Sequence, residues 1–237
     1  MAGGLGSRLS SVVPDLPKSM APISGKPFLS YLLNYLYTQG IEKFILSLGY
    51  KYEVIQEFIY DQFSIPASRS LGEGGFNIQC SIEVEPLGTG GGIKLACSKT
   101  KSENVLIVNG DTFFKIDVPR LMDFHIAKDS HCTLVLKPMR KFSRYGAVEL
   151  NIDDSISNFR EKQFFDRGLI NGGVYVLNVP QFMQEELPDK FSIEKDYLEK
   201  FYQKRRIFGM IQDEYFIDIG VPEDYERAQV EVDRLKS

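Results

Sequence analysis

The stretch that decides the fold is residues 76–111, which read FNIQCSIEVEPLGTGGGIKLACSKTKSENVLIVNGD. Its apolar side chains alternate from Phe76 to Val84, and this alternation predicts a half-buried strand. A glycine cluster then opens a helix that we expect over residues 88–99. Val105–Val108 is a fully apolar strand that ends in Asn109-Gly110-Asp111. This order of strand, helix and strand is typical of a sheet whose ligands bind at the C-terminal ends of its strands.

The same alternation extends outward from this stretch over the first 140 residues. Helices are expected there at residues 28–39, 53–63 and 118–128, and strands at 44–48 and 132–137. Beyond residue 140, shorter strands are expected at 147–150, 155–160, 173–177, 207–211 and 215–219, with helices at 192–202 and 222–235. The pattern predicts an α/β fold with a doubly wound, mostly parallel, Rossmann-like sheet and small β elements in the C-terminal half.

One domain is expected over residues 1–237, because no repeat, linker or low-complexity segment interrupts the sequence. A glycine-rich loop of the kind found near the N-terminus normally follows a buried strand, yet only Met1 and Ala2 precede this one. We therefore expect that the first strand of the sheet lies upstream of this sequence or is missing from it.

The composition disfavours several classes of function. A formal net charge of −4 at pH 7 is a poor match for a nucleic-acid-binding protein, which usually carries a basic surface. Cys80, Cys97 and Cys132 lie far apart in sequence, which disfavours a zinc site and a disulfide framework and is typical of a reducing compartment. No apolar run approaches the roughly 20 residues of a membrane span. We expect a cytoplasmic protein without nucleic-acid or membrane partners.

Two motifs near the N-terminus bear on phosphate binding. Gly3-Gly4-Leu5-Gly6-Ser7-Arg8-Leu9 offers backbone N–H groups and a guanidinium that can hold phosphate oxygens. Its spacing is neither that of a dinucleotide loop nor that of a Walker loop, and on glycine count alone a flexible tail is an equally good interpretation. Pro17-Lys18-Ser19-Met20-Ala21-Pro22 holds Lys18 on a stiff segment, although a lysine near prolines is ordinarily a solvated loop residue.

The pairing of these two motifs, followed by Gly25-Lys26-Pro27, resembles the signature of the sugar-1-phosphate nucleotidylyltransferases. The resemblance continues along nearly the whole chain, through residues 85–91, Asn109-Gly110-Asp111, Tyr145-Gly146, Glu161-Lys162, Asn171-Gly172-Gly173 and residues 216–220. Each later motif alone is better explained as a turn or a surface pair, but their order and spacing together favour the family. Within it, residues 51–55, 169–173 and 218–225 resemble the D-glycero-α-D-manno-heptose 1-phosphate guanylyltransferases.

The resemblance implies a fold of the nucleotide-diphospho-sugar transferase type, with a nucleotide-binding half over about 1–140 and a sugar-binding half over about 141–237. It implies roles for residues in four groups. These are catalysis by Arg8, Lys18 and Asp111; nucleotide binding by Gly3, Gly4, Leu5, Gly6, Ser7, Leu87, Gly88 and Thr89; sugar-phosphate binding by Gly146, Glu161, Lys162 and Asn171; and a Mg²⁺ ion on Asp111 and Asp218. The implied substrates are a nucleoside triphosphate, GTP by preference, and a heptose 1-phosphate.

Several alternatives stay open. The pair of substrates could be mannose 1-phosphate with GTP, or glucose 1-phosphate with dTTP, UTP or CTP. A non-catalytic subunit that senses nucleotide sugars could share the fold, but it would be expected to lose the charged residues that this sequence keeps. A nicotinamide-dependent dehydrogenase is disfavoured because the glycine loop has the wrong spacing. His125 and His131 lie outside every motif, and a homo-oligomer is compatible with the sequence.

Overall fold

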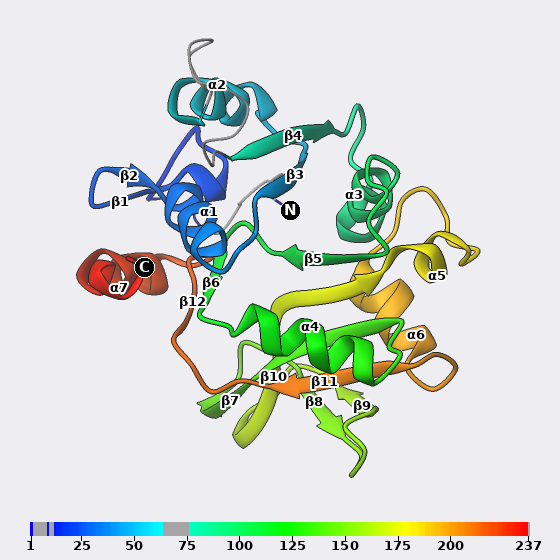
Figure 1. Cartoon of the computed structure of the whole chain (residues 1–237). Helices are drawn as coiled ribbons and strands as arrows, with labels where there is room; N and C mark the ends of the chain where they lie inside the picture. The colour runs from blue at the N-terminus through cyan, green and yellow to red at the C-terminus, as the bar shows by residue number, and fades with distance from the viewer. Residues whose placement is uncertain (2–8, 10–11, 64–75, 237) are drawn as a thin grey trace.

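The computed structural model describes residues 1, 9, 12–63 and 76–236 (Figure 1). Its largest sheet has six strands in the order β11-β7-β10-β8-β9, with β5 paired to β10 off this path. The strands are β5 (Asn104–Val108), β7 (Cys132–Phe142), β8 (Ala147–Leu150), β9 (Ile156–Arg160), β10 (Phe165–Asn178) and β11 (Ile207–Ile211). The long strand β10 is the centre of this sheet, because β5, β7 and β8 all pair with it.

The α/β class is confirmed, but the pairing in this sheet differs from the expected mostly parallel order. Among the described strands, β11 and β7 are parallel, whereas β10 runs antiparallel to β5, β7 and β8, and β8 runs antiparallel to β9. For β8 and β9 the reason lies in their connection. Residues 151–155 form a short turn between these two strands, and a short turn can join only antiparallel neighbours, since a parallel pair needs a long crossover. Residues 143–146 and 161–164 are equally short, but they join β7 to β8 and β9 to β10, which are not neighbours in the sheet.

A second, two-stranded sheet carries the parallel pairing expected of the N-terminal half. Strands β3 (Lys43–Leu48) and β4 (Asn77–Ile82) pair in parallel along their whole length, from Lys43 opposite Asn77 to Leu48 opposite Ile82. Helices α1 (Phe28–Thr38) and α2 (Tyr52–Phe63) flank this part of the chain (Figure 1). The expected helices at 28–39 and 53–63 and the expected strands at 44–48 and 76–84 are therefore confirmed within a few residues.

Short strands and helices join these sheets, and most of them were not predicted from the sequence. Strands β6 (Thr112–Phe114) and β12 (Phe216–Asp218) form an antiparallel pair, and β1 (Pro22–Ile23) pairs with β2 (Lys26–Pro27). The remaining helices are α3 (Gly88–Cys97), α4 (Val118–Ala127), α5 (Val179–Met183), α6 (Glu199–Phe201) and α7 (Pro222–Val230). The short helical turns η1 (Lys18–Met20), η2 (Ile193–Leu198) and η3 (Val232–Arg234) complete the list, and η2 has π-helical geometry where an α-helix over 192–202 was expected.

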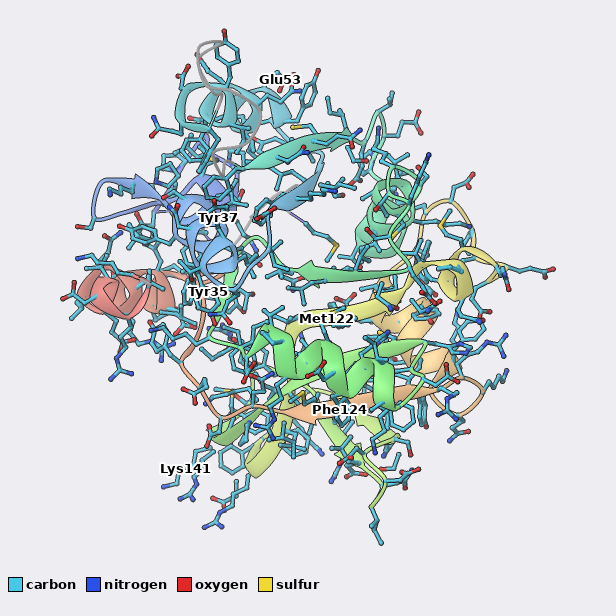
Figure 2. The ribbon with its side chains drawn as sticks, in the orientation of Figure 1. Tyr35, Tyr37, Glu53, Met122, Phe124 and Lys141 are labelled. Carbon is cyan, nitrogen blue, oxygen red and sulfur yellow. The ribbon has the colours of Figure 1, made fainter. Side chains whose placement is uncertain are left out.

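Two buried apolar clusters hold these layers together. The larger one joins α1 and β3 to β6 and β12, and it includes the fully buried side chains of Phe28 and Phe113. Burial of such an aromatic side chain stabilises the fold by about 1.5–3 kcal/mol. Tyr35 of α1 also ties the layers with its hydroxyl, which donates to the Ile116 carbonyl (2.8 Å) and accepts from the Ile116 N–H (2.7 Å); Figure 2 labels this side chain. The second cluster lies between the six-stranded sheet, α3 and η2.

The glycine cluster at the start of α3 is explained by the close approach of the segment around Phe191. A Cβ atom on Gly90 would lie 2.1 Å from Cε2 of Phe191, and one on Gly91 would lie 2.2 Å from the Asp189 carbonyl oxygen. The Gly90 N–H also donates to the Phe191 carbonyl (2.9 Å). The glycines therefore serve the packing of α3 against the chain that leads into η2, and this packing fixes where α3 begins.

Among the described helices, none combines the length and the apolar character needed to cross a membrane.

Candidate active site

A cavity of about 630 Å³ opens where β3, β4 and β5 reach their C-terminal ends. Its walls come from the segments after these three strands, from η1, from the start of α3 and from Met1. The lining residues are Met1, Lys18, Ser19, Ser47, Gly49, Tyr50, Lys51, Tyr52, Glu53, Glu83, Val84, Pro86, Gly88, Thr89, Asn109, Gly110 and Asp111. The position at strand ends is the one expected from the sequence, and the volume is typical of a pocket for a nucleotide-sized ligand.

Lys18 and Asp111 meet in this cavity although 93 residues separate them. The Lys18 Nζ lies 3.2 Å from Asp111 Oδ2. Lys18 is held by the single turn of η1, whereas Asp111 lies between the end of β5 and the start of β6. The side chains are 19% and 28% exposed, so the ion pair is accessible to a ligand that enters the cavity. Two of the predicted catalytic residues are therefore in direct contact.

Asp218, the last residue of β12, lies next to Asp111. It pairs with Thr112 across the β6–β12 ladder, and the Ile219 N–H donates to the Asp111 carbonyl (3.0 Å). A methyl group built on Gly220 would lie 2.8 Å from Asp218 Oδ1 and 3.5 Å from Lys18 Nζ. Asp218 and Lys18 thus approach the same point beside Gly220, and the fold brings the two predicted metal ligands to neighbouring strand ends.

A network around Arg144 holds the Asp218 carboxylate. Asp218 Oδ1 accepts from the Gly220 N–H (2.8 Å), and Asp218 Oδ2 accepts from Arg144 Nη2 (3.0 Å) and from the Tyr145 hydroxyl (3.1 Å). The other nitrogen of the same guanidinium, Nη1, forms an ion pair with Oδ2 of Asp224. Burial, and then the negative charge of Asp218, raises the pKa of Tyr145, so its hydroxyl remains a hydrogen-bond donor.

Arg144 and Asp224 were not predicted as site residues from the sequence. Burial lowers the pKa of the Arg144 guanidinium, but Tyr145 and the carboxylates of Asp224 and Asp218 raise it overall, so this group keeps its charge. Their position in the sequence was the available signal: Arg144 directly precedes the Tyr145-Gly146 motif, and Asp224 lies in the stretch 218–225 that carries the resemblance to the guanylyltransferases.

The predicted base-binding turn borders the cavity. Gly88 and Thr89 line it, whereas Leu87 is not among the lining residues and donates its N–H to Glu83 Oε2 (3.0 Å). Gly88 has a φ of +72°, and a Cβ there would lie 2.6 Å from the Phe191 carbonyl oxygen, so both the backbone conformation and the space require glycine. Glu83, which the sequence analysis did not single out, also accepts a hydrogen bond from Ser47 Oγ (3.2 Å).

The predicted sugar-side residues fall into two groups. Asn171 lies beside the Asp111 segment: its Oδ1 accepts from the Gly173 N–H (3.0 Å), and the Asn109 N–H donates to the Gly173 carbonyl (3.0 Å). Asn171 Nδ2 also donates to the Tyr175 hydroxyl (2.9 Å). Gly146, Glu161 and Lys162 lie farther along the sheet, where β8 and β9 meet, and they are not among the residues that line the cavity.

The predicted glycine-loop residues, Gly3 to Ser7 and Arg8, lie outside the described residues. Met1 is described, and its backbone bridges the end of β5: its N–H donates to the Val108 carbonyl (2.7 Å), and the Gly110 N–H donates to the Met1 carbonyl (2.6 Å). The start of the described chain is therefore hydrogen-bonded beside Asp111.

The carboxylates present are suited to Mg²⁺. In the part of the chain that the structure describes, no group of three or more His, Cys, Asp or Glu side chains could hold a metal ion by itself. Mg²⁺ is, however, commonly held by one or two carboxylates together with substrate phosphates. Asp111 and Asp218 provide such a pair, and both side chains are partly exposed beside the cavity.

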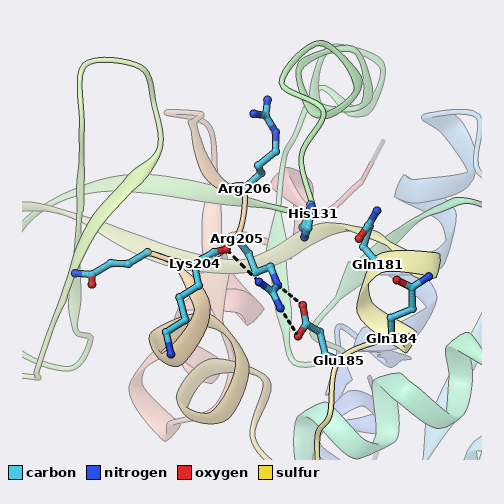
Figure 3. A pocket seen from close by; sticks show the side chains of 8 residues that line it. His131, Gln181, Gln184, Glu185, Lys204, Arg205 and Arg206 are labelled. Atoms are coloured by element: carbon cyan, nitrogen blue, oxygen red, sulfur yellow. Dashed lines mark hydrogen bonds and ion pairs between the residues drawn. The ribbon is translucent and has the colours of Figure 1, made fainter.

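A separate cavity of about 600 Å³ lies at the N-terminal ends of β7 and β11, and none of the predicted site residues lines it (Figure 3). Its main feature is the ion pair between Arg205 and Glu185, in which Arg205 Nη2 donates to Glu185 Oε2 (3.1 Å). Arg206 points away from this pair (Figure 3) and donates to the Asp129 carbonyl (2.8 Å).

Comparisons with known proteins bear on the first cavity. Residues 1–234 match the nucleotidyl transferase family. A D-glycero-alpha-D-manno-heptose 1-phosphate guanylyltransferase of Aneurinibacillus thermoaerophilus is 48% identical over 232 residues, which cover 98% of this chain and 96% of that protein. The enzyme of the same name from Campylobacter jejuni is 46% identical over 225 residues, 95% of each chain.

Two solved structures have a fold similar to that of this chain. The crystal structure of HddC from Yersinia pseudotuberculosis superposes with a TM-score of 0.85 at 36% identity, covering 98% of this chain and 96% of that one. The same protein complexed with GMP-PN superposes with a TM-score of 0.84. Each of these similarities extends over nearly the full length of both proteins.

Proposed function

Since the chain belongs to the nucleotidyl transferase family, we propose that it transfers guanylate from GTP to D-glycero-α-D-manno-heptose 1-phosphate, with release of pyrophosphate. Two relatives with that activity in their names, at 48% and 46% identity, support the choice of substrates. The observation that carries the proposal is the meeting of Lys18, Asp111 and Asp218 beside a cavity at the strand ends.

The reaction needs alignment and charge neutralisation more than it needs acid–base catalysis. An oxygen of the sugar phosphate attacks the α-phosphorus of GTP, and the bond from that phosphorus to the oxygen bridging to the β-phosphate breaks as pyrophosphate leaves. The attacking oxygen is already anionic, so no proton has to be removed from it. The enzyme must hold two polyanions in line and stabilise the charge that shifts toward the leaving group.

Cationic and amide groups would bind the triphosphate. Lys18 Nζ already lies in the cavity, where it would stabilise the α-phosphate once it is released from Asp111. Arg8 and the backbone N–H groups of Gly3, Gly4, Leu5, Gly6 and Ser7 would hold the β- and γ-phosphates, with Arg8 near the departing pyrophosphate. The turn at Leu87, Gly88 and Thr89 would face the guanine base, and its two cavity-lining residues support this orientation.

Asp111 and Asp218 would hold the Mg²⁺ ion together with the phosphates of the nucleotide. When bound, Mg²⁺ supplies positive charge that neutralises the phosphate oxygens at the reacting centre. The contribution of the protein is to keep the two carboxylates at adjacent strand ends, through the Asp218–Thr112 pair and the Ile219–Asp111 hydrogen bond.

The heptose phosphate would bind on the side of the six-stranded sheet. Lys162 would take its phosphate, while Glu161, Gly146 and Asn171 would take its hydroxyls. The contact between the Asn171 turn and Asn109 supports a sugar position next to Asp111. In this arrangement the nucleotide occupies the half over about 1–140, and the sugar occupies the half over about 141–237. Both proposed substrates are charged metabolites of the cytoplasm, where we propose that the enzyme acts.

A pyrophosphate-release assay across substrates tests the proposal. With Mg²⁺, the expected result is the highest kcat/KM for GTP with heptose 1-phosphate, and lower values for mannose 1-phosphate, glucose 1-phosphate and the other nucleoside triphosphates. A non-catalytic nucleotide-sugar-sensing protein would release no pyrophosphate with any pair. Asp111→Asn should reduce the rate by roughly 10²–10³-fold without unfolding the protein. A preference for another pair of substrates would refute the assignment to heptose.

A further inference from the structure

The Arg144 guanidinium lies between two carboxylates that belong to different elements. Its Nη2 lies 3.0 Å from Oδ2 of Asp218, at the end of β12, and its Nη1 forms an ion pair with Asp224, in the first turn of α7. The guanidinium carbon lies 4.9 Å from the centre of the Tyr145 ring, so the planar group is held on one face as well. Arg144 thus has partners on three sides.

The charges around the two predicted metal ligands balance. Asp111 pairs with Lys18, Asp218 pairs with Arg144, and Asp224 pairs with both Arg144 and Arg227. Each of the two predicted metal ligands therefore already faces a cation, Lys18 for Asp111 and Arg144 for Asp218. A divalent ion is attracted to a carboxylate pair chiefly by uncompensated negative charge, and here little of that charge is uncompensated.

We propose that Arg144 is the resident counter-ion of Asp218, which keeps this carboxylate from binding a free divalent cation and makes metal binding depend on the nucleotide. This inference rests on the metal role assigned to Asp218 under the proposed function. The triphosphate supplies the negative charge that the carboxylates lack, so the ion enters together with GTP. The Arg144 side chain is 31% exposed, so it has room to move away from Asp218 when the ion arrives.

The geometry requires arginine at this position. One guanidinium reaches Asp218 with Nη2 and Asp224 with Nη1 at the same time, and it stacks on the Tyr145 ring. The ammonium of a lysine is a single point of charge without a planar face, so it could neutralise one carboxylate but could not bridge both. Arg144 is therefore a positioning residue for Asp218 as well as its counter-charge.

Binding of Mn²⁺ without turnover tests the proposal. The affinity is measured from the loss of the free-ion EPR signal without GTP, and with GTP from the signal lost beyond that of the same Mn²⁺–GTP mixture without protein, in the wild type, Arg144→Gln and Arg144→Lys. Arg227→Gln is the matched control, because among the described ion pairs Arg227 pairs with Asp224 (3.1 Å) on α7 and not with Asp218. Removing one positive charge a few ångströms from a divalent ion should strengthen its binding by roughly tenfold or more.

The expected result is that Arg144→Gln binds Mn²⁺ in the absence of GTP at least about tenfold more tightly than the wild type. Arg144→Lys should show a smaller gain, and Arg227→Gln should change by less than about twofold, because an exposed surface charge is screened by solvent. Thermal melting of each variant confirms that it is folded.

Three outcomes would overturn the proposal. These are unchanged Mn²⁺ affinity in Arg144→Gln, an equal gain in Arg227→Gln, and absence of Mn²⁺ binding by the wild type even with GTP. Failure of the proposed function is a different result: the wild type would release no pyrophosphate, whatever the Mn²⁺ affinities are.

Discussion

Replacing Gly220 with alanine should remove most turnover while leaving the fold largely intact. The backbone of Gly220 is not among the glycines with positive φ, so alanine is compatible with its conformation. The added methyl group would lie 2.8 Å from Asp218 Oδ1, the oxygen that the Gly220 N–H itself binds at 2.8 Å. Because the contact is shorter than van der Waals packing allows, the Asp218 carboxylate must rotate or shift.

Two consequences of different size follow from that shift. Crowding of this kind costs about 1–3 kcal/mol of stability, which a chain of this length should survive. Displacing a reacting or metal-binding group by about 1 Å costs roughly 10²-fold in rate, because the reactants are no longer aligned. We therefore expect kcat for pyrophosphate release to fall about 10²-fold, with a modest decrease in melting temperature.

The matched control is Gly168→Ala in β10. A Cβ atom there would lie 3.1 Å from Cζ of Phe142, the far end of a ring that can shift, and its nearest neighbours belong to Phe142 and Ala147, neither of which is a predicted site residue. This variant should keep a rate near that of the wild type. If Gly220→Ala turned over within about threefold of the wild type, the placement of Asp218 in the reaction would be refuted.

Three further predictions concern pH, packing and metal. Burial lowers the pKa of His125 from 6.5 to about 4. Between these two pH values the unfolded chain binds a proton that the folded chain excludes, so the free energy of unfolding should fall as the pH drops from 6.5 to 4. In His125→Gln the melting temperature should therefore depend less on pH across that range. Gly90→Ala, whose methyl would lie 2.1 Å from Cε2 of Phe191, should lower stability by about 1–3 kcal/mol in urea unfolding, despite the better helix propensity of alanine. EDTA should abolish pyrophosphate release, because it removes the metal ion. It should leave the melting temperature unchanged, because Lys18 and Arg144 already neutralise Asp111 and Asp218 in the folded protein. A large decrease in melting temperature with EDTA would contradict this second expectation.

Features that depend on neighbours along the chain could be read from the sequence. The apolar periodicity of residues 28–39 and 76–84 predicted α1 and β4, because the side-chain repeats of helix and strand are local properties of the backbone. The positions of Asp111 and Asp218 at strand ends were also predicted, because an apolar run precedes each of them, with only Asn109 and Gly110 between Val108 and Asp111. The roles of Arg8 and of the loop at residues 3–7 remain predictions.

Other features depended on contacts between distant segments. The sequence pattern predicted a strand at 173–177 but not that β10 runs from Phe165 to Asn178 and pairs antiparallel with β5, because the pairing of strands this far apart in the chain depends on tertiary contacts. In the same way, the charge of Arg144 was visible, but its partners were not. Asp218 and Asp224 lie 74 and 80 residues away along the chain. The sequence alone therefore determined which chemical groups this protein carries and which strand ends present them. Only the tertiary structure decided which cation faces which carboxylate, because that pairing depends on how remote strands pack and not on the residues beside each group.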